Sequence, residues 1–261
     1  MIQFLKDSTF AVNEVINKSW DVLRQHYFSV AGLCFLLFVT SNTSGILAFY
    51  FSEVNPFLSA FMAFLFVILY FGIQLTLFKY IFRLIDGQGH VHLSDTIPST
   101  RELIYFFAAM FCMVGIALLM YFLISVIGFP LVYAGILVDA LVEGTWIISA
   151  ILIFFFLLRV AFYPFFIMES HAGPWRSIKL SFALTKGNVT KLLLILVFFA
   201  ILHLLYIYFN YSGYPVVSTL LSLVNSFLVV PLSSVVVAMA YRDMMAHYAG
   251  GEDPSVTDNI I

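Results

Sequence analysis

Charged residues are scarce in this chain of 261 residues. Only 10% of the residues are Asp, Glu, Lys or Arg, against 62% hydrophobic and 18% aromatic residues, whereas a soluble domain carries about 25% charged residues. The mean hydropathy is +1.03, and several apolar runs exceed about 18 residues, the length that indicates a transmembrane helix. The composition therefore excludes an ordinary soluble domain and predicts a polytopic membrane protein.

The chain also has few cysteines and no net positive charge. The two cysteines, Cys34 and Cys112, both lie in apolar runs, so they cannot form the disulfide framework of a small secreted protein. We interpret both as small buried hydrophobic residues. The formal net charge is −2, so no global basic field attracts nucleic acid, and we expect no nucleic-acid partner.

Catalytic motifs are missing from the sequence. It contains no H-E-x-x-H, G-x-S-x-G or Walker pattern. The segment HVHLSD, residues 90–95, has the H-x-x-x-x-D spacing of an acyltransferase base and an H-x-H pair that suits a metal if extended. Its connection offers no oxyanion donors and no glycine-rich phosphate cradle. We interpret it as a solvated loop, with metal binding and acyl transfer as alternatives, and expect no catalytic residue, metal or cofactor.

Six apolar runs predict six transmembrane helices. Each is long enough to cross about 30 Å of hydrocarbon, and backbone groups in lipid must bond within their own segment. Residues 128–144 are apolar enough either to extend the third helix or to form a re-entrant piece. The six predicted spans are roughly residues 28–51, 57–82, 103–127, 146–168, 189–209 and 216–240.

The basic residues are distributed unevenly over the predicted connections. Eleven of the twelve lie in the N-terminal segment, in the second and fourth connections with their edges, or in the C-terminal tail, and the other three connections contain none. Because Lys and Arg in loops set the orientation of a membrane protein, this distribution predicts cytoplasmic N- and C-termini. The eleven residues are Lys6, Lys18, Arg24, Lys79, Arg83, Arg101, Arg176, Lys179, Lys186, Lys191 and Arg242.

Two segments on the predicted cytoplasmic side have amphipathic patterns. Residues 170–188 have a Pro and a Gly at the positions that suit the two ends of a helix. On a helix, Trp175, Ile178 and Phe182 would form an apolar stripe edged by cations, which suits a membrane interface. An irregular loop is the alternative. The N-terminal segment, residues 1–27, also has helix-spaced apolar positions among its charges.

We therefore predict an all-α polytopic membrane protein. It has six transmembrane helices plus one or two cytoplasmic interfacial amphipathic helices. A single integral membrane domain, residues 1–261, would comprise an N-terminal interfacial helix (1–27), a six-span bundle (28–240) with the interfacial segment 170–188, and a cytoplasmic tail (241–261).

Polar side chains within the predicted spans are the candidate functional residues. Such residues either line a cavity or hydrogen-bond between helices, and we favour the second interpretation. Pro130, Pro164 and Pro231 could mark kinks beside them. At about 1.5 Å per residue, two layers form: Gln74, Arg159, Ser233 and Ser234 lie about 9–14 Å from the cytoplasmic end, and Asn42, His203 and Asn225 about 20 Å from it.

The segments RVAFYPFFI, GPWRSIKLSFALTKGN and AYRDM resemble a family of bacterial membrane proteins. This family includes the YciC-type proteins and the membrane domain fused to some glycerophosphodiester phosphodiesterases. The resemblance covers roughly residues 70–245 and departs from the family pattern at 177–178, where the family has Ala-Leu. It implies a polytopic fold in the bacterial inner membrane, but no phosphodiesterase domain accompanies it here. The matching positions are Arg159, Pro164, Ser181, Leu184, Thr185, Gly187 and residues 241–243.

These features favour a non-catalytic integral protein of the bacterial inner membrane that acts through partners, lipids or membrane organisation. The expected partners are membrane lipids and either another protein or a second copy of the chain. One alternative is a small-molecule or lipid transporter with a cavity near Arg159. Another is an intramembrane or interfacial enzyme, for which the sequence supplies no nucleophile–base constellation.

Arg159 is the one basic residue that lies away from the edges of a predicted span, about 14 Å from the cytoplasmic end. Insertion scales assign a cost of roughly 2.5–3.5 kcal/mol to Arg near a helix centre, so it needs acceptors or a functional reason to persist. We favour a functional role. Its expected partners are Gln74, Ser233, Ser234, backbone carbonyls near Pro164 and Pro231, or an anionic lipid headgroup drawn inward.

Overall fold

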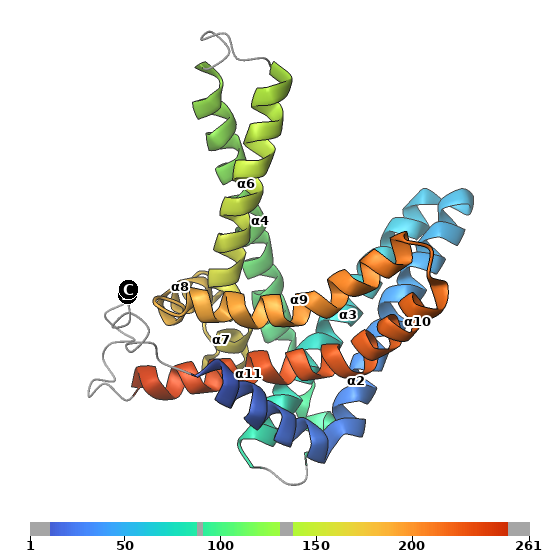
Figure 1. Ribbon diagram of the computed structural model, residues 1–261, viewed down its shortest axis with the longest axis vertical. Coiled ribbons are helices and arrows are strands. Elements are labelled where there is room, and N and C mark those ends of the chain that lie inside the picture. Colours follow the sequence, from blue (N-terminus) through green and yellow to red (C-terminus); the bar gives the residue numbers. More distant parts are fainter. Residues whose placement is uncertain (1–10, 88–90, 131–137, 250–261) are drawn as a thin grey trace. The chain divides into compact units, whose positions relative to one another are not determined.

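The structure is a computed structural model that describes residues 11–87, 91–130 and 138–249. The described residues are 90% helical and contain no strand. Six helices in these ranges are long and apolar enough to cross a membrane (Figure 1). This confirms the prediction of an all-α polytopic membrane protein.

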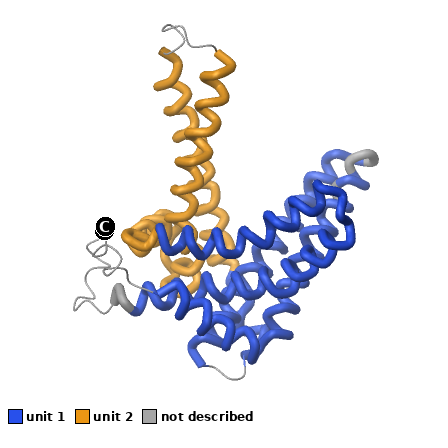
Figure 2. The backbone as a smooth tube through the Cα atoms, in the orientation of Figure 1, with its two compact units in different colours: residues 1–99, 190–253 blue, residues 100–189, 254–261 orange. Residues whose placement is uncertain are grey.

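The chain divides into two compact units (Figure 2). Unit 1 comprises residues 1–99 and 190–253, and unit 2 comprises residues 100–189 and 254–261. The described part of unit 2, residues 100–189, is thus inserted between two parts of unit 1. The two ends of this inserted part lie next to the starts of the apolar helices that begin at Thr100 and Val189. Each unit is described by itself below.

Unit 1 begins with a hairpin of two long helices. Asn55 ends the first of them, and its Oδ1 accepts hydrogen bonds from the backbone N–H groups of Phe57 at 2.9 Å and Leu58 at 3.3 Å. Pro56 follows in the first turn, where its missing N–H costs nothing. The elements of this unit are α2 (Val12–Val54), α3 (Pro56–Ile85), η1 (Leu93–Thr96), α9 (Val189–Tyr211), α10 (Pro215–Val224), η2 (Asn225–Val229) and α11 (Val230–Ala249).

Helix α2 is bent at His26, which has φ −122° and ψ 24° instead of helical values. The bend lies next to residue 27, where we predicted the end of an interfacial helix. In Figure 1 the segment before the bend runs at a clear angle to the rest of α2. Val15, Ser19 and Leu23 form its buried side, so this short amphipathic segment packs through one face and presents its charges on the other.

The sixth span contains a single π-helical turn, η2, between α10 and α11. Pro231, one residue after the start of α11, has no N–H to give to the carbonyl of Phe227 four residues earlier. The hydroxyl of Tyr27 on α2 donates to that carbonyl at 2.7 Å. A side chain from the neighbouring helix thus satisfies the group that the proline leaves free.

Unit 2 contains α4 (Thr100–Gly128), α6 (Val138–Val160), α7 (Tyr163–Ser170) and α8 (Pro174–Leu184). Helices α4 and α6 pack against each other, and a Cβ at Gly128 would lie 3.3 Å from Leu141 Cδ1. Extension of the third helix through residue 144 is wrong, because α4 ends at Gly128 and residues 138–144 already belong to α6. Residues 131–137 lie outside the described part of the chain.

The fourth predicted span is broken rather than continuous. Helix α6 ends at Val160 and α7 starts at Tyr163, with Pro164 in its first turn. A proline inside a helix lacks an N–H and clashes with the carbonyl four residues earlier, here that of Val160. An apolar run of uniform composition predicts one helix, whereas the proline geometry divides it into two.

Of the two cysteines, only Cys34 is buried. Its thiol interacts with the hydroxyl of Ser234 on α11. Cys112 is exposed on α4, so the prediction of burial is wrong there. An apolar run long enough to span a membrane turns part of its surface outward, and hydrophobicity alone does not tell which part.

Candidate functional site: the break between α6 and α7

The hydroxyl of Ser181 on α8 bridges the break between α6 and α7. It donates to the carbonyl of Arg159 at 2.9 Å and accepts the backbone N–H of Phe162 at 3.1 Å. Thr185 Oγ1 lies 3.1 Å from the same Arg159 carbonyl and 2.9 Å from the carbonyl of Ser181. Two hydroxyls, four residues apart, therefore supply partners to backbone groups at the end of α6.

The guanidinium of Arg159, on α6, binds a backbone group at the end of α8. Its Nη2 donates to the carbonyl of Phe182 at 2.8 Å, and its Cζ lies 4.0 Å from the centroid of the Phe182 ring. Carbonyls in the last turn of a helix lack intrahelical partners, and a cation there is favoured by the helix dipole. The Nε atom is buried without a hydrogen-bond partner. Arg159 thus ties α6 to the C-terminal end of α8.

The partner of Arg159 differs from the expected ones. Within unit 2 the acceptor is the carbonyl of Phe182 at the end of α8, which was not among the expected partners. The expected partners came from the spans or from lipid, so the connecting helix α8 was not among them. The combination that indicates this contact is a proline in the span followed, on the next helix, by hydroxyls four residues apart.

Helix α8 packs through a different face from the predicted stripe. Of the three stripe residues, Ile178 is buried, whereas Trp175 is 54% exposed and Phe182 is half-buried. The buried face consists of Ser177, Ile178, Ser181 and Leu184. The predicted stripe did not include the serines, which are buried here because their hydroxyls bind backbone carbonyls.

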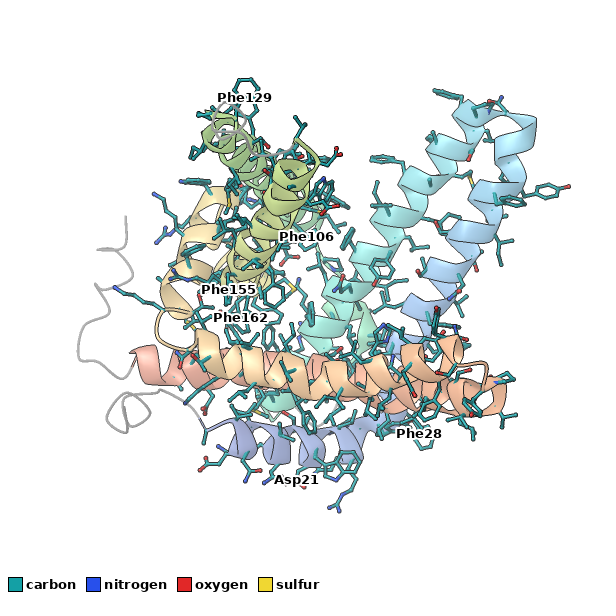
Figure 3. All side chains as sticks on the ribbon, turned by 45° about the horizontal axis from the view of Figure 1, so that its top comes forward. Asp21, Phe28, Phe106, Phe129, Phe155 and Phe162 are labelled. Carbon is teal, nitrogen blue, oxygen red and sulfur yellow. The ribbon has the colours of Figure 1, made fainter. Side chains whose placement is uncertain are left out.

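Further contacts hold α7 to the start of α4. The rings of Phe106 and Tyr163 stack with their centroids 5.3 Å apart. Glu102 is only 4% exposed, and its Oε1 lies 3.8 Å from His171 Nδ1. Figure 3 shows Phe106 from α4, Phe155 from α6 and Phe162 from the break among the aromatic side chains of this unit. The break is therefore surrounded by packed rings and one buried carboxyl group.

The other six candidate residues belong to unit 1, whereas Arg159 belongs to unit 2. Asn42 Nδ2 donates to the carbonyl of Phe38 at 2.8 Å. Both Ser233 and Ser234 donate to the carbonyl of Val230 at 2.9 Å. The His203 ring contacts that of Tyr206, while Gln74 and Asn225 are half-buried. Each of these hydrogen bonds joins a side chain to a carbonyl three or four residues earlier in the same helix. The two serine hydroxyls and the Asn42 amide therefore bind the backbone of their own helix.

Two grooves occur within the described helices of single units. One, of about 280 Å³, lies between α2 and α3 and combines three hydroxyl groups of α2 with the hydroxyl of Tyr70. The other, of about 450 Å³, lies between α4 and α6 and is mainly apolar. Arg159 lines neither of them. The first groove is lined by Thr40, Ser41, Ser44, Phe66, Val67, Tyr70 and Phe71.

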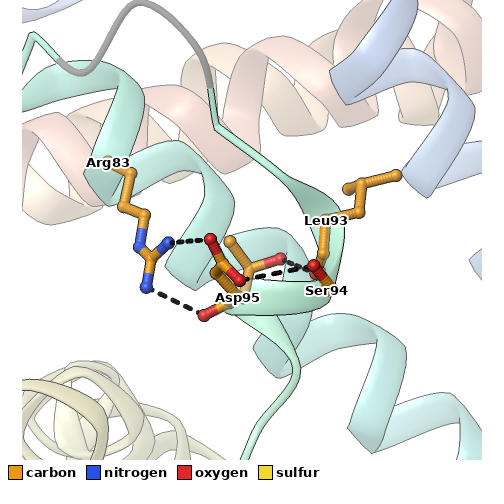
Figure 4. A network of polar contacts seen from close by, with 5 residues as sticks. Arg83, Leu93, Ser94 and Asp95 are labelled. Carbon is orange, nitrogen blue, oxygen red and sulfur yellow. Dashed lines mark hydrogen bonds and ion pairs between the residues drawn. The ribbon is translucent and has the colours of Figure 1, made fainter.

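In the HVHLSD segment, Asp95 is engaged by an arginine (Figure 4). Arg83 Nη1 lies 3.6 Å from Asp95 Oδ2, and its Nη2 donates to the Asp95 carbonyl at 2.8 Å. The interpretation of Asp95 as the residue that orients a histidine base is left without support, and His90 lies outside the described residues. Across the described ranges, no group of three His, Cys, Asp or Glu residues could hold a metal ion.

The C-terminal AYRDM segment connects α11 with α3. Arg242 Nη2 lies 2.7 Å from Asp86 Oδ2, and its Cζ lies 4.9 Å from the centroid of the Phe82 ring. That ring in turn contacts buried Tyr241, with centroids 5.6 Å apart. Asp243 interacts electrostatically with Lys191 at the start of α9. These charges therefore join helix ends within unit 1.

Comparison with known proteins adds no relative: no family model, curated protein or solved structure matches the chain. The resemblance to the YciC-type family stays a prediction. The structure does bring several of its motif positions together in unit 2, since Ser181 and Thr185 bind Arg159 beside the break at Pro164. Gly187 has φ +85°, a left-handed conformation that favours glycine. Arg159, Pro164, Ser181 and Thr185 thus meet at one structural feature of unit 2, whereas residues 241–243 belong to unit 1.

Proposed function

We propose that this chain is a non-catalytic integral protein of the bacterial inner membrane that acts through lipids, partner proteins or membrane organisation. The observation that supports it is the use of polar side chains within the apolar helices. Arg159, Ser181 and Tyr27 bind backbone carbonyls at helix ends and breaks. Groups consumed in this way hold the helices together, and they offer no nucleophile with an adjacent base.

We further propose that both termini are cytoplasmic. The distribution of Lys and Arg supports this orientation, because eleven of the twelve lie in the two termini and in the second and fourth connections, which share one side of the predicted spans. The ion pairs of Arg83 with Asp95 and of Arg242 with Asp86 lie at the C-terminal ends of α3 and α11. Both ends face the same compartment in an arrangement of six spans.

Native mass spectrometry of the full chain, extracted together with its surrounding bilayer in polymer-bounded discs, tests the proposal. We expect phospholipid or a second polypeptide to remain bound when the annular lipid is stripped by collisional activation. A bare chain that instead moves a small solute across proteoliposomes would contradict the proposal.

The hydroxyl-lined groove between α2 and α3 favours a second candidate function, transport of a small molecule or lipid. Its three α2 hydroxyls lie in the middle of an apolar span, where polar groups are expensive. Filling the groove with Ser41→Leu and Ser44→Leu separates the two functions. If the protein is a transporter, the double variant should lose solute flux. If the protein has the proposed non-catalytic function, the double variant should retain its bound lipid or partner protein.

A further inference from the structure

The exposed side of α8 carries cations and an indole ring. We define the basic face of α8 as Trp175, Arg176, Lys179 and Lys186, the last just beyond the helix end; all four are exposed. Lys179 Nζ lies 6.0 Å from the centroid of the Trp175 ring. An indole beside the long apolar stems of lysines suits the boundary between hydrocarbon and headgroups, where the stems lie along apolar surface and the ammonium groups reach water.

The direction of this face is set by the opposite side of the helix. Ser177, Ser181 and Leu184 are buried against the rest of unit 2. The bonds of Ser181 to Arg159 and Phe162, and of Arg159 to Phe182, prevent rotation of α8 about its axis. Lys179 is therefore held outward by a packed and hydrogen-bonded helix, which lowers the entropy lost when it binds an anion.

The charge of the segment has one sign. Residues 170–188 contain three Lys or Arg and no Asp or Glu. The connection is also short: three residues separate α7 from α8, and four separate α8 from α9. Helices α7 and α9 both belong to apolar spans, so α8 is tethered within a few residues of the bilayer. A positive face at that position is complementary to phosphate groups of the membrane surface.

We propose that the basic face of α8 binds the phosphate headgroups of anionic phospholipids in the bilayer that holds the protein. The inference rests on the proposed function, and it names the lipid class and the surface that binds it. Lys179 and Lys186 supply the charge, and Trp175 inserts beside the headgroup. Near an anionic membrane surface each lysine contributes an enrichment of about fivefold in the local concentration of such lipids.

Quenching of Trp175 fluorescence measures this enrichment. In the full chain with Trp20→Phe and Trp146→Phe, Trp175 is the remaining tryptophan. The protein is reconstituted in phosphatidylcholine vesicles that contain the same small fraction of either brominated phosphatidylglycerol or brominated phosphatidylcholine. We expect several-fold stronger quenching by the anionic lipid, and we expect about 1 M salt to remove most of the excess because it screens the charges.

A matched pair of charge variants completes the test. Lys179→Gln/Lys186→Gln should abolish the preference for phosphatidylglycerol. The control variant, Lys18→Gln/Arg24→Gln, removes the same amount of charge from exposed positions of α2. It should keep the preference for phosphatidylglycerol. The inference would be overturned if both lipids quench Trp175 equally in the protein that keeps Lys179 and Lys186. It would also be overturned if the α8 variant keeps the preference for phosphatidylglycerol. Either result leaves the proposed function intact. If neither lipid quenches Trp175, α8 does not lie at the membrane interface. That result would count against both the inference and the proposed function.

Discussion

Ser181 and Arg159 hold each other's helices: the Ser181 hydroxyl donates to the Arg159 carbonyl at 2.9 Å, and the Arg159 guanidinium donates to the carbonyl of Phe182, the residue after Ser181. The bonds run in opposite directions between the end of α6 and the end of α8. Each helix supplies a side chain to backbone groups of the other. Removal of either side chain should therefore expose unpaired groups on its partner helix.

Ser181→Ala should destabilise the protein by about 1–3 kcal/mol. The change leaves the buried N–H of Phe162 without its partner and removes one of two hydroxyls from the Arg159 carbonyl. Thermal unfolding in detergent, followed by fluorescence-detected size exclusion, measures the effect. Ser177→Ala is the matched control, since Ser177 is equally buried on α8 but binds only the local carbonyl of Pro174. Equal shifts for the two variants would argue against the bridge.

Arg159→Leu should fold, with a change in thermal stability of only a few degrees. The variant loses a charged hydrogen bond worth about 1.5–3 kcal/mol but also removes a charge that costs roughly 2.5–3.5 kcal/mol near a helix centre. The two effects nearly cancel. Under the functional interpretation of Arg159, this stable variant fails to complement a deletion strain, while Arg159→Lys complements in part. Full complementation by a stably inserted Arg159→Leu protein would refute that interpretation.

Tyr27→Phe should cost about 1 kcal/mol, because it removes the hydroxyl that satisfies the Phe227 carbonyl before Pro231. Urea or thermal unfolding in the same detergent measures the loss. Tyr211→Phe provides the control, since Tyr211 is 92% exposed. If Pro231→Ala is combined with Tyr27→Phe, the restored backbone N–H should bind Phe227 and make the loss smaller. A loss of the same size in both backgrounds would contradict this account of the π-helical turn.

The proposed orientation predicts which single cysteines react in intact cells. In a chain without Cys34 and Cys112, cysteines at Asp139 and Ser212 should react with a membrane-impermeant thiol reagent added outside. Cysteines at Asn17 and Ser94 should react only after lysis. All four positions are exposed. Labelling of Ser94→Cys from outside would reverse the orientation inferred from the basic residues.

The six long helices could be predicted from the sequence because a span needs only length and apolar composition. The break after Val160 was indicated only in part, since Pro164 was expected to mark a kink but the apolar run around it predicted one continuous helix. The face of α8 was misassigned for a related reason. Hydropathy treats Ser177 and Ser181 as water-seeking, whereas helix ends and proline breaks provide carbonyls that make buried hydroxyls favourable.

The site was partly predictable as well. Composition singled out Arg159, because it is the one basic residue away from the edges of a span, but not its partners on α8. Those partners depend on how a connection folds back, which periodicity within one helix does not report. The division into two units escaped prediction because apolar spans of similar composition occur in both of them.

The bridge by Ser181 also imposes an order on biosynthesis. Ser181 follows Arg159 by 22 residues in the chain, which takes roughly 1–4 s at about 5–20 residues per second. During that interval the ribosome has released the broken helix but not the hydroxyls that complete it, so the backbone groups of Arg159 and Phe162 must find water or lipid headgroups instead. The break therefore matures only when α8 emerges, and a pause in translation between these two residues would prolong the most exposed stage of membrane insertion.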